Sequence, residues 1–326
     1  MNDGWSFNNS KQANTVKRQV AGGNLACNSD DEQVVPVGIP AVDWHRPWLL
    51  PLAGVSQAVA LGLASGSVAD ALNVAVPTQG CPVQFTAADA APPGEAYEAF
   101  IRRTAQVPTR NNLHDLFNGL VWLRFPQSKA VLNRLQAEAI AAQGVGAVRG
   151  PVRDAITVFD ENGALLLAPP DVAAVLWPAL LARDWHALLV THRALWDQAQ
   201  LVLFGHALME QLVSPRKNIT AHVLVEPFAV GCGAFAQSAP GLLHTDAWAA
   251  LDAALAARLT SEWLAGKPFT PLPVLGVPGW WPANADPGFY ADASVFRPAR
   301  RGQWPHRQPI DTESPGPVAV APPSLS

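Results

Sequence analysis

The spacing of hydrophobic residues predicts a body built mainly from short helices. In SKAVLNRLQAEAIAAQG, residues 128–144, Val131, Leu132, Leu135 and Ala139 share one helical face, and Gly144 follows as a stop signal. The same kind of pattern predicts further helices in segments 54–64, 67–76, 94–106, 171–182, 184–214 and 245–266.

Two segments have the pattern of β-structure instead. In AITVFDENGALLLA, residues 155–168, two β-prone runs flank the quartet Asp-Glu-Asn-Gly, and Asn-Gly is a strong hairpin signal. Residues 219–226 alternate well enough to form a third strand. The sequence therefore predicts an α+β fold that is mainly α-helical, with a small antiparallel sheet made of this hairpin and this strand.

The composition changes at both ends of the chain. Residues 1–34 are polar and without periodicity, so we expect a disordered extension, and residues 299–326 are expected to be a disordered Pro-rich tail. Between them, residues 35–298 are predicted to form a single globular domain. The 30 prolines of the chain favour many connections, including long ordered loops rich in Pro, Gly and aromatic residues.

Composition and charge exclude several classes of protein. Hydrophobic residues make up 49% of the chain and charged residues 15%, which supports a sizeable core. The net charge of −4 gives no global attraction for nucleic acid, and no apolar run is long enough for a membrane helix. Cys27, Cys81 and Cys232 form no C-x-x-C pair, so we expect reduced thiols in a cytoplasmic protein.

One candidate site lies in RNNLHDLFNGLVWLRFP, residues 110–126. If a helix begins after Asn112, Asp115 occupies its third position, where a carboxylate can bond back to the cap and favour the positive helix end. Asn118 then shares a face with His114 and can satisfy its imidazole. The alternative interpretation is that His114 and Asp115 hold a metal ion.

A second pair of polar residues lies within an apolar helical segment, LFGHALMEQL. His206 and Glu210 are four residues apart, so they project from one helix face at a separation of about 6 Å. They can share a metal ion, or Glu210 can orient His206 in an acid–base pair, or they can be a buried histidine and its salt-bridge partner. Asp154, next to Arg153, and His222 in the predicted strand could reach the same pocket.

Established motifs do not decide between these interpretations. We find no G-x-S-x-G, no P-loop and no G-x-G-x-x-G. The His-Asp dipeptide is typical of one family of helical metal phosphohydrolases, but that family needs an upstream histidine, and here His45 lies in a Pro/Trp loop. The Gly-Cys-Gly segment at Cys232 gives a flexible thiol with no strong base beside it, which argues against a nucleophile.

A loop near the C-terminus gives a second hypothesis. Aromatic faces interspersed with a few polar groups suit a small-molecule or sugar surface, although such a loop can equally cover the core. The residues concerned are Trp280, Trp281, Phe289, Tyr290 and Phe296, with Asn284, Asp286, Asp292 and Arg297 between them.

Several stretches taken together resemble an uncharacterised bacterial family, a domain of unknown function common in proteobacteria. They are NLHDLFNGLVWLRFPQSKAVLN, RGPVRDAITVFDENGALL, LFGHALMEQLVSP with ITAH, and PLPVLGVPGWWPANADPGFYADASVFRP. The resemblance runs from about residue 40 to 300, so it implies one intact domain with both ends outside it. It brings no activity, substrate or cofactor.

The functional hypothesis is a metal-assisted hydrolase-like enzyme, with a small molecule as a candidate ligand and no substrate indicated. Its ligands or acid–base groups would be His114, Asp115, His206 and Glu210, with Asp154 in support. Histidine with carboxylate suits Zn, Mn or Fe better than Ca or Mg. The rival hypothesis is a non-catalytic binding or scaffold protein in which the same residues form a buried structural network.

Overall fold

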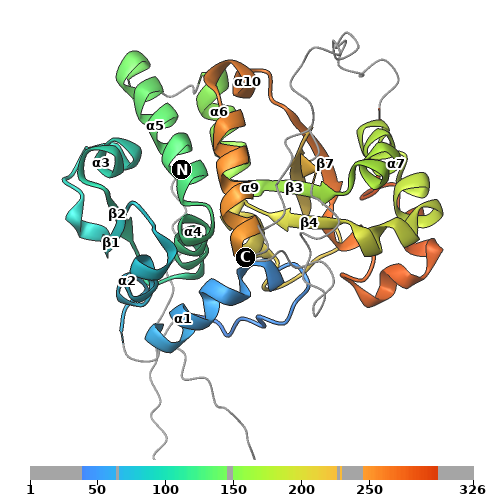
Figure 1. Cartoon of the computed structure of the whole chain (residues 1–326), viewed down its shortest axis with the longest axis horizontal. Helices are drawn as coiled ribbons and strands as arrows, with labels where there is room; N and C mark the ends of the chain where they lie inside the picture. Colours follow the sequence, from blue (N-terminus) through green and yellow to red (C-terminus); the bar gives the residue numbers. More distant parts are fainter. Residues whose placement is uncertain (1–38, 64–65, 145–149, 226–227, 230–244, 300–326) are drawn as a thin grey trace, which may run out of the picture. The chain divides into compact units, whose positions relative to one another are not determined.

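Helices make up most of the described chain (Figure 1). The computed structural model describes residues 39–63, 66–144, 150–225, 228–229 and 245–299. Its α-helices are α1 (Ala53–Leu63), α2 (Val68–Gln79), α3 (Tyr97–Thr104), α4 (Leu113–Arg124), α5 (Pro126–Gln143), α6 (Pro151–Asn162), α7 (Pro170–Ala182), α8 (His206–Gln211), α9 (Thr245–Arg258) and α10 (Ser261–Ala265). None of these helices is long and apolar enough to cross a membrane.

The strands form two small sheets. They are β1 (Gln84–Ala87), β2 (Gln106–Thr109), β3 (Gly163–Ala168), β4 (Gln200–Leu203), β5 (Thr220–Leu224), β6 (Phe228–Ala229) and β7 (Phe269–Pro273). β1 and β2 pair in parallel. The larger sheet has the order β4-β3-β5-β7, with β6 also paired to β3. Every residue of β3 is buried, so this apolar strand lies at the centre of the core.

The predicted fold class is confirmed, but the predicted hairpin is wrong. Residues 151–162 form α6, and the Asn-Gly step at Asn162 and Gly163 is the junction from this helix into β3. Ile156 and Phe159 are buried on one face of α6, which gives the helix its tertiary support. The larger sheet is also mixed, because β3 runs antiparallel to β4 but parallel to β5.

The end of α6 and the start of α8 are fixed to each other by buried aromatic rings. The rings of Phe159 and Phe204 are stacked with their centroids 4.5 Å apart, and Phe125 packs on Phe204 at 5.2 Å. All three side chains are fully buried. Asp160 and His206 follow these anchors closely in sequence, so the aromatic core determines where their side chains lie.

Glycine allows the backbone to approach closely at the same place. A Cβ at Gly205 would lie 2.5 Å from the backbone of Asn162, and one at Gly163 would lie 2.3 Å from the carbonyl oxygen of Phe159. The N–H groups of Phe204 and Gly205 both donate to the carbonyl of Gly163, each at 2.9 Å. These contacts bring the first residue of α8 against the last turn of α6.

Some predictions concern segments outside the described residues. These are the N-terminal extension 1–34, nearly all of the C-terminal tail 299–326, and the Gly-Cys-Gly segment at Cys232.

Candidate metal centre

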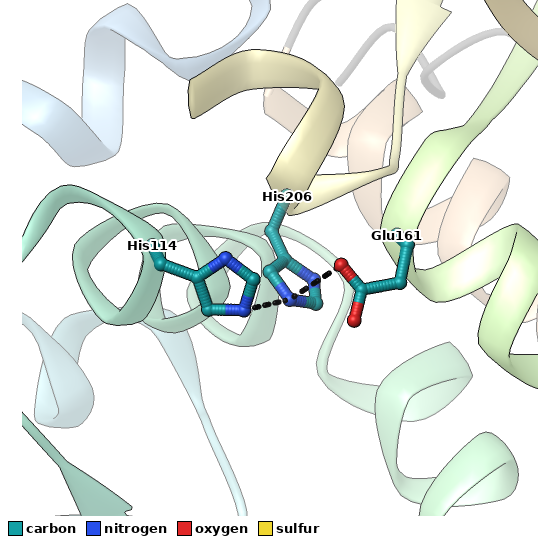
Figure 2. Close-up of side chains that lie close together, drawn as sticks. All are labelled: His114, Glu161 and His206. Atoms are coloured by element: carbon teal, nitrogen blue, oxygen red, sulfur yellow. Dashed lines mark hydrogen bonds and ion pairs between the residues drawn. The ribbon is translucent and has the colours of Figure 1, made fainter. Parts of the chain in front are cut away.

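Three side chains from different helices converge on one point (Figure 2). His114 lies in the first turn of α4, His206 is the first residue of α8, and Glu161 lies in the last turn of α6. The two Nε2 atoms are 3.0 Å apart, and a Glu161 oxygen lies 3.6 Å from Nε2 of His206. All three residues offer a ligand atom, and these atoms lie within 4.8 Å of one another.

The two separations at His206 fit a first-row metal ion. With metal–ligand distances of about 2.0–2.1 Å and tetrahedral geometry, neighbouring ligand atoms lie about 3.3 Å apart. The 3.0 and 3.6 Å separations bracket that value. Two imidazoles and one carboxylate are a ligand set typical of catalytic zinc sites, which keep one position open.

Glu210 orients His114 rather than His206. Its carboxylate lies 2.9 Å from Nδ1 of His114. This bond places the proton of a neutral His114 on Nδ1 and leaves the Nε2 lone pair directed at the centre. A carboxylate that holds the far nitrogen of a metal-binding histidine is the usual outer support of such sites.

His206 is the most deeply buried of the three residues, with 4% of its surface exposed. Burial lowers its pKa to about 4, although the carboxylate of Asp160 opposes this effect. Its imidazole is therefore neutral at pH 7, the form that binds a metal. Its Nδ1 atom has no hydrogen-bond partner among the described residues and lies 3.8 Å from a carboxylate oxygen of Asp160.

The pairing of the two imidazoles explains this unpartnered nitrogen. Because the Nδ1 proton of His114 goes to Glu210, the 3.0 Å contact between Nε2 atoms needs a proton on Nε2 of His206. That tautomer leaves a bare lone pair on the buried Nδ1 of His206 beside a carboxylate. Metal ligation through Nε2 would move the proton to Nδ1, where it faces Asp160.

An ion pair with the buried ammonium of Lys129 supports the partly buried Asp160 from the opposite side. The ammonium of Lys129 donates to Asp160 at 2.5 Å and to the side chain of Asn118 at 2.9 Å. Burial acts to raise the pKa of Asp160, but the charge and the hydrogen bond of Lys129 outweigh it, so the pKa is lowered and the carboxylate is ionised. The pKa of Glu161 is raised by burial and by Asp160.

The converging residues lie on the wall of a cavity of about 610 Å³. Its lining is unusually rich in polar side chains, contributed mainly by α3, α4, α5 and α6. The polar residues are Tyr97, Glu98, Arg110, His114, Asp115, Asn118, Lys129, Asn133, Gln136, Arg153, Thr157, Asp160, Glu161 and His206. A cavity of this size accommodates a small molecule.

Asp115 makes the contacts of a helix-capping residue. Its N–H donates to the side chain of Asn112 at 2.8 Å, so Asn112 is the N-cap of a helix that begins at Leu113, whereas the expected bond from the Asp115 carboxylate back to this cap is replaced by bonds to Arg110. Its carboxylate accepts from the backbone N–H of Arg110 at 2.6 Å and from the guanidinium of Arg110 at 2.9 and 3.0 Å. Asp115 lines the cavity, but it is not one of the three converging residues.

The other sequence candidates lie apart from the three converging residues. Asp154, in the first turn of α6, pairs with Lys267. His222 on β5 is half-buried and packs its ring edge-on against Phe269. Neither Asp154 nor His222 lines the cavity.

Glu161, Asp160 and Lys129 were missed by the sequence analysis. Asp160 and Glu161 belong to the quartet that predicts a hairpin turn, and Lys129 belongs to a segment that predicts an ordinary amphipathic helix. The one available signal was the spacing of Val152, Ile156 and Phe159, which is helical and would have placed Asp160 and Glu161 on the last turn of a helix.

The aromatic loop near the C-terminus packs as a cover over the core. Asn284 is 1% exposed, and its side-chain amide donates to the carbonyls of Leu275 and Val277. Arg193 donates to Asn284 and to the hydroxyl of Tyr290. Because these polar groups satisfy one another, the contacts favour the covering interpretation over a sugar-binding surface.

Comparison with known proteins places the chain in a family. Residues 83–300 match the family model described as "Protein of unknown function (DUF3025)", and the match covers more than half of the chain. The chain belongs to the DUF3025 family. The match includes all three converging residues and confirms the resemblance to an uncharacterised family. No curated protein and no solved structure matches, so the chemistry of the site itself is the guide to the function of this DUF3025 member.

Proposed function

We propose that this DUF3025 protein is a metal-dependent enzyme that hydrolyses a small molecule. His114, His206 and Glu161 are the proposed ligands of a divalent transition metal such as Zn, Mn or Fe. The observation that carries the proposal is the meeting of two Nε2 atoms at 3.0 Å beside a carboxylate, on the wall of a polar cavity.

The surrounding residues support this set of ligands. Glu210 holds His114 through Nδ1, and Asp160 faces Nδ1 of His206. Lys129 fixes the carboxylate of Asp160. Each proposed histidine ligand therefore has an acidic group behind it, which orients the ring and raises its basicity as a ligand.

Three protein ligands leave a position open toward the cavity. A divalent ion there lowers the pKa of a coordinated water toward 7, which is the chemistry that supports hydrolysis. Asp115 and Asp154 are left out of the ligand set because Arg110 and Lys267 engage their carboxylates. Glu210 is assigned to the support of His114 instead of direct ligation.

The test is metal-dependent turnover. The protein is stripped of metal, reloaded with Zn, Mn or Fe(II), and assayed on ester, amide and phosphoester substrates. We expect turnover of one class that needs the metal and that Glu161→Gln abolishes, while Glu138→Gln, which removes an exposed carboxylate of α5, leaves it unchanged. Absence of turnover, with metal bound, would favour the non-catalytic binding protein. Absence of bound metal would refute both the proposed enzymatic function and the proposed metal centre.

A further inference from the structure

Some polar side-chain atoms that line the cavity lack a hydrogen-bond partner in the described part of the chain and play no part in the proposed metal centre. Among the described residues, buried side-chain polar atoms without a hydrogen-bond partner include Nδ1 of His206, Nε of Arg153 and Oε1 of Gln136. All three residues line this one cavity. Buried polar groups are normally satisfied, so each exception needs an explanation. Five other unpartnered atoms among the described residues lie outside this cavity, so the inference depends on the environment of Arg153 and not on their number.

Arg153 is the strongest of these exceptions. Its surface is 7% exposed, yet no carboxylate among the described residues pairs with it. The only hydrogen bond of its side chain to a described residue is from Nη1 to the carbonyl of Gly144, at 3.4 Å. A buried guanidinium without a counter-charge is costly, because a charge loses its hydration on burial.

The position of Arg153 separates it from the metal centre. It lies seven residues before Asp160 on α6, which is two helical turns or about 10 Å along the axis. Gln136 likewise lies seven residues after Lys129 on α5, and Lys129 pairs with Asp160. The two helices follow each other through a short connection, so Arg153 and Gln136 lie toward the same end of the cavity, away from Lys129 and Asp160.

We propose that this end of the cavity is a subsite for an oxyanion group, a carboxylate or a phosphate. A guanidinium offers Nε and Nη as a pair of parallel donors to two oxygens of such a group. The amide of Gln136 can turn to present its N–H₂ as a further donor. An anion bound there accepts from the guanidinium of Arg153 and supplies its counter-charge, and it accepts from Gln136 only when the amide has turned in this way.

This inference names the substrate class of the proposed enzyme and therefore rests on the proposed function. The substrate would be a small molecule whose anionic group binds Arg153 while its hydrolysable bond lies at the centre formed by His114, His206 and Glu161. The separation of about 10 Å along α6 corresponds to a spacer of several bonds between the two groups.

The experiment measures oxyanion binding to metal-free protein, so that coordination of the probe by metal plays no part. Inorganic phosphate and acetate are titrated separately by calorimetry, at constant ionic strength maintained with sodium chloride. The variants are Arg153→Gln, Arg153→Lys and Gln136→Leu. The matched control is Arg134→Gln, which removes one positive charge from an exposed ion pair on α5.

We expect at least one probe to bind the wild type, and Arg153→Gln to weaken it at least about tenfold. Arg153→Lys should recover part of this loss, Gln136→Leu should weaken binding several-fold, and Arg134→Gln should change it less than about twofold. Binding of phosphate alone identifies a phosphorylated substrate, and binding of acetate alone identifies a carboxylate. The proposal is overturned if neither probe binds, or if Arg153→Gln and Arg134→Gln weaken binding equally.

A stability measurement separates a ligand-binding arginine from a structural one. Without an anion, Arg153→Met should raise the urea midpoint of the metal-free protein, because it removes a buried unpaired charge. A lower midpoint would indicate a structural role and would overturn the subsite. Metal content, measured in the same variants, separates the two proposals. Arg153→Gln should weaken anion binding and still retain metal. If instead the wild type binds no metal, the proposed metal centre fails, but phosphate or acetate should still bind at Arg153.

Discussion

The close approach of Gly205 to the end of α6 gives a sharp test of how the metal centre is built. In Gly205→Ala the new Cβ would lie 2.5 Å from the N and Cα atoms of Asn162 and from the carbonyl oxygen of Glu161. Ordinary contact begins near 3.4 Å, so α8 and α6 must separate by about 0.9 Å. These are backbone atoms, which cannot turn aside as a flexible side chain could.

That displacement has two measurable consequences. Overpacking of this kind costs about 1–3 kcal/mol of unfolding free energy. The movement also carries His206 away from Glu161, whereas the metal–ligand distances of a well-formed site lie within about 0.2 Å of their usual values. We therefore expect zinc affinity to fall at least about tenfold. Urea unfolding followed by circular dichroism and zinc titration against a chromophoric chelator measure the two effects.

The control is Gly54→Ala in the first turn of α1. A Cβ there would meet only the guanidinium of Arg124, at 3.6 Å, and alanine favours the helix by up to about 1 kcal/mol. This variant should be as stable as the wild type or more stable, with unchanged zinc affinity. If Gly205→Ala also retained wild-type stability and zinc affinity, the close approach would not determine the geometry of the centre.

Three further predictions concern the residues around the cavity. Glu210→Gln should weaken zinc binding about 10- to 100-fold in the same titration, because His114 loses its acidic support; equal affinities would refute that role. Lys129→Met should cost about 1–3 kcal/mol in urea unfolding, because it leaves the partly buried carboxylate of Asp160 unpaired. Adding Asp160→Asn should restore part of the loss, and a purely additive double variant would contradict the ion pair. Burial raises the pKa of Glu98 to about 7, so the folded protein holds a proton that the unfolded chain loses above about pH 4.3. The free energy of unfolding should then fall by up to about 1.4 kcal/mol per pH unit as pH rises toward 7, and Glu98→Gln should lack this component. Identical slopes in pH-dependent urea unfolding would show that Glu98 titrates normally.

Local sequence patterns were sufficient to find two of the three proposed ligands. His114 and His206 stand out in the sequence because each is a polar residue within an apolar helical segment. Both belong to the three residues that converge at the candidate metal centre. The spacing of His206 and Glu210 also indicated a pair, but the structure connects Glu210 to His114 on another helix. A spacing within one helix shows which residues share a face, whereas the partner across the interface depends on packing.

The third proposed ligand, Glu161, was not predicted because the local sequence favours a turn where tertiary packing instead supports a helix. The quartet at residues 160–163 has the composition of a hairpin turn, yet Phe159 stacks on both Phe204 and Phe269. This burial supports a helix up to Asn162, with β3 immediately after it. The parallel pairing of β3 with β5 joins segments more than 50 residues apart, so no pattern within residues 155–168 could reveal it.

The most direct test of the account is the metal content of the purified, untagged protein by elemental analysis. We predict about one equivalent of a transition metal, present as isolated or after reloading with Zn, Mn or Fe. His114→Ala, His206→Ala and Glu161→Gln should each lose it, and His45→Ala, which alters an exposed histidine, should retain it. A wild type that binds no metal after reloading, or metal that persists in all three variants, would contradict the central claim.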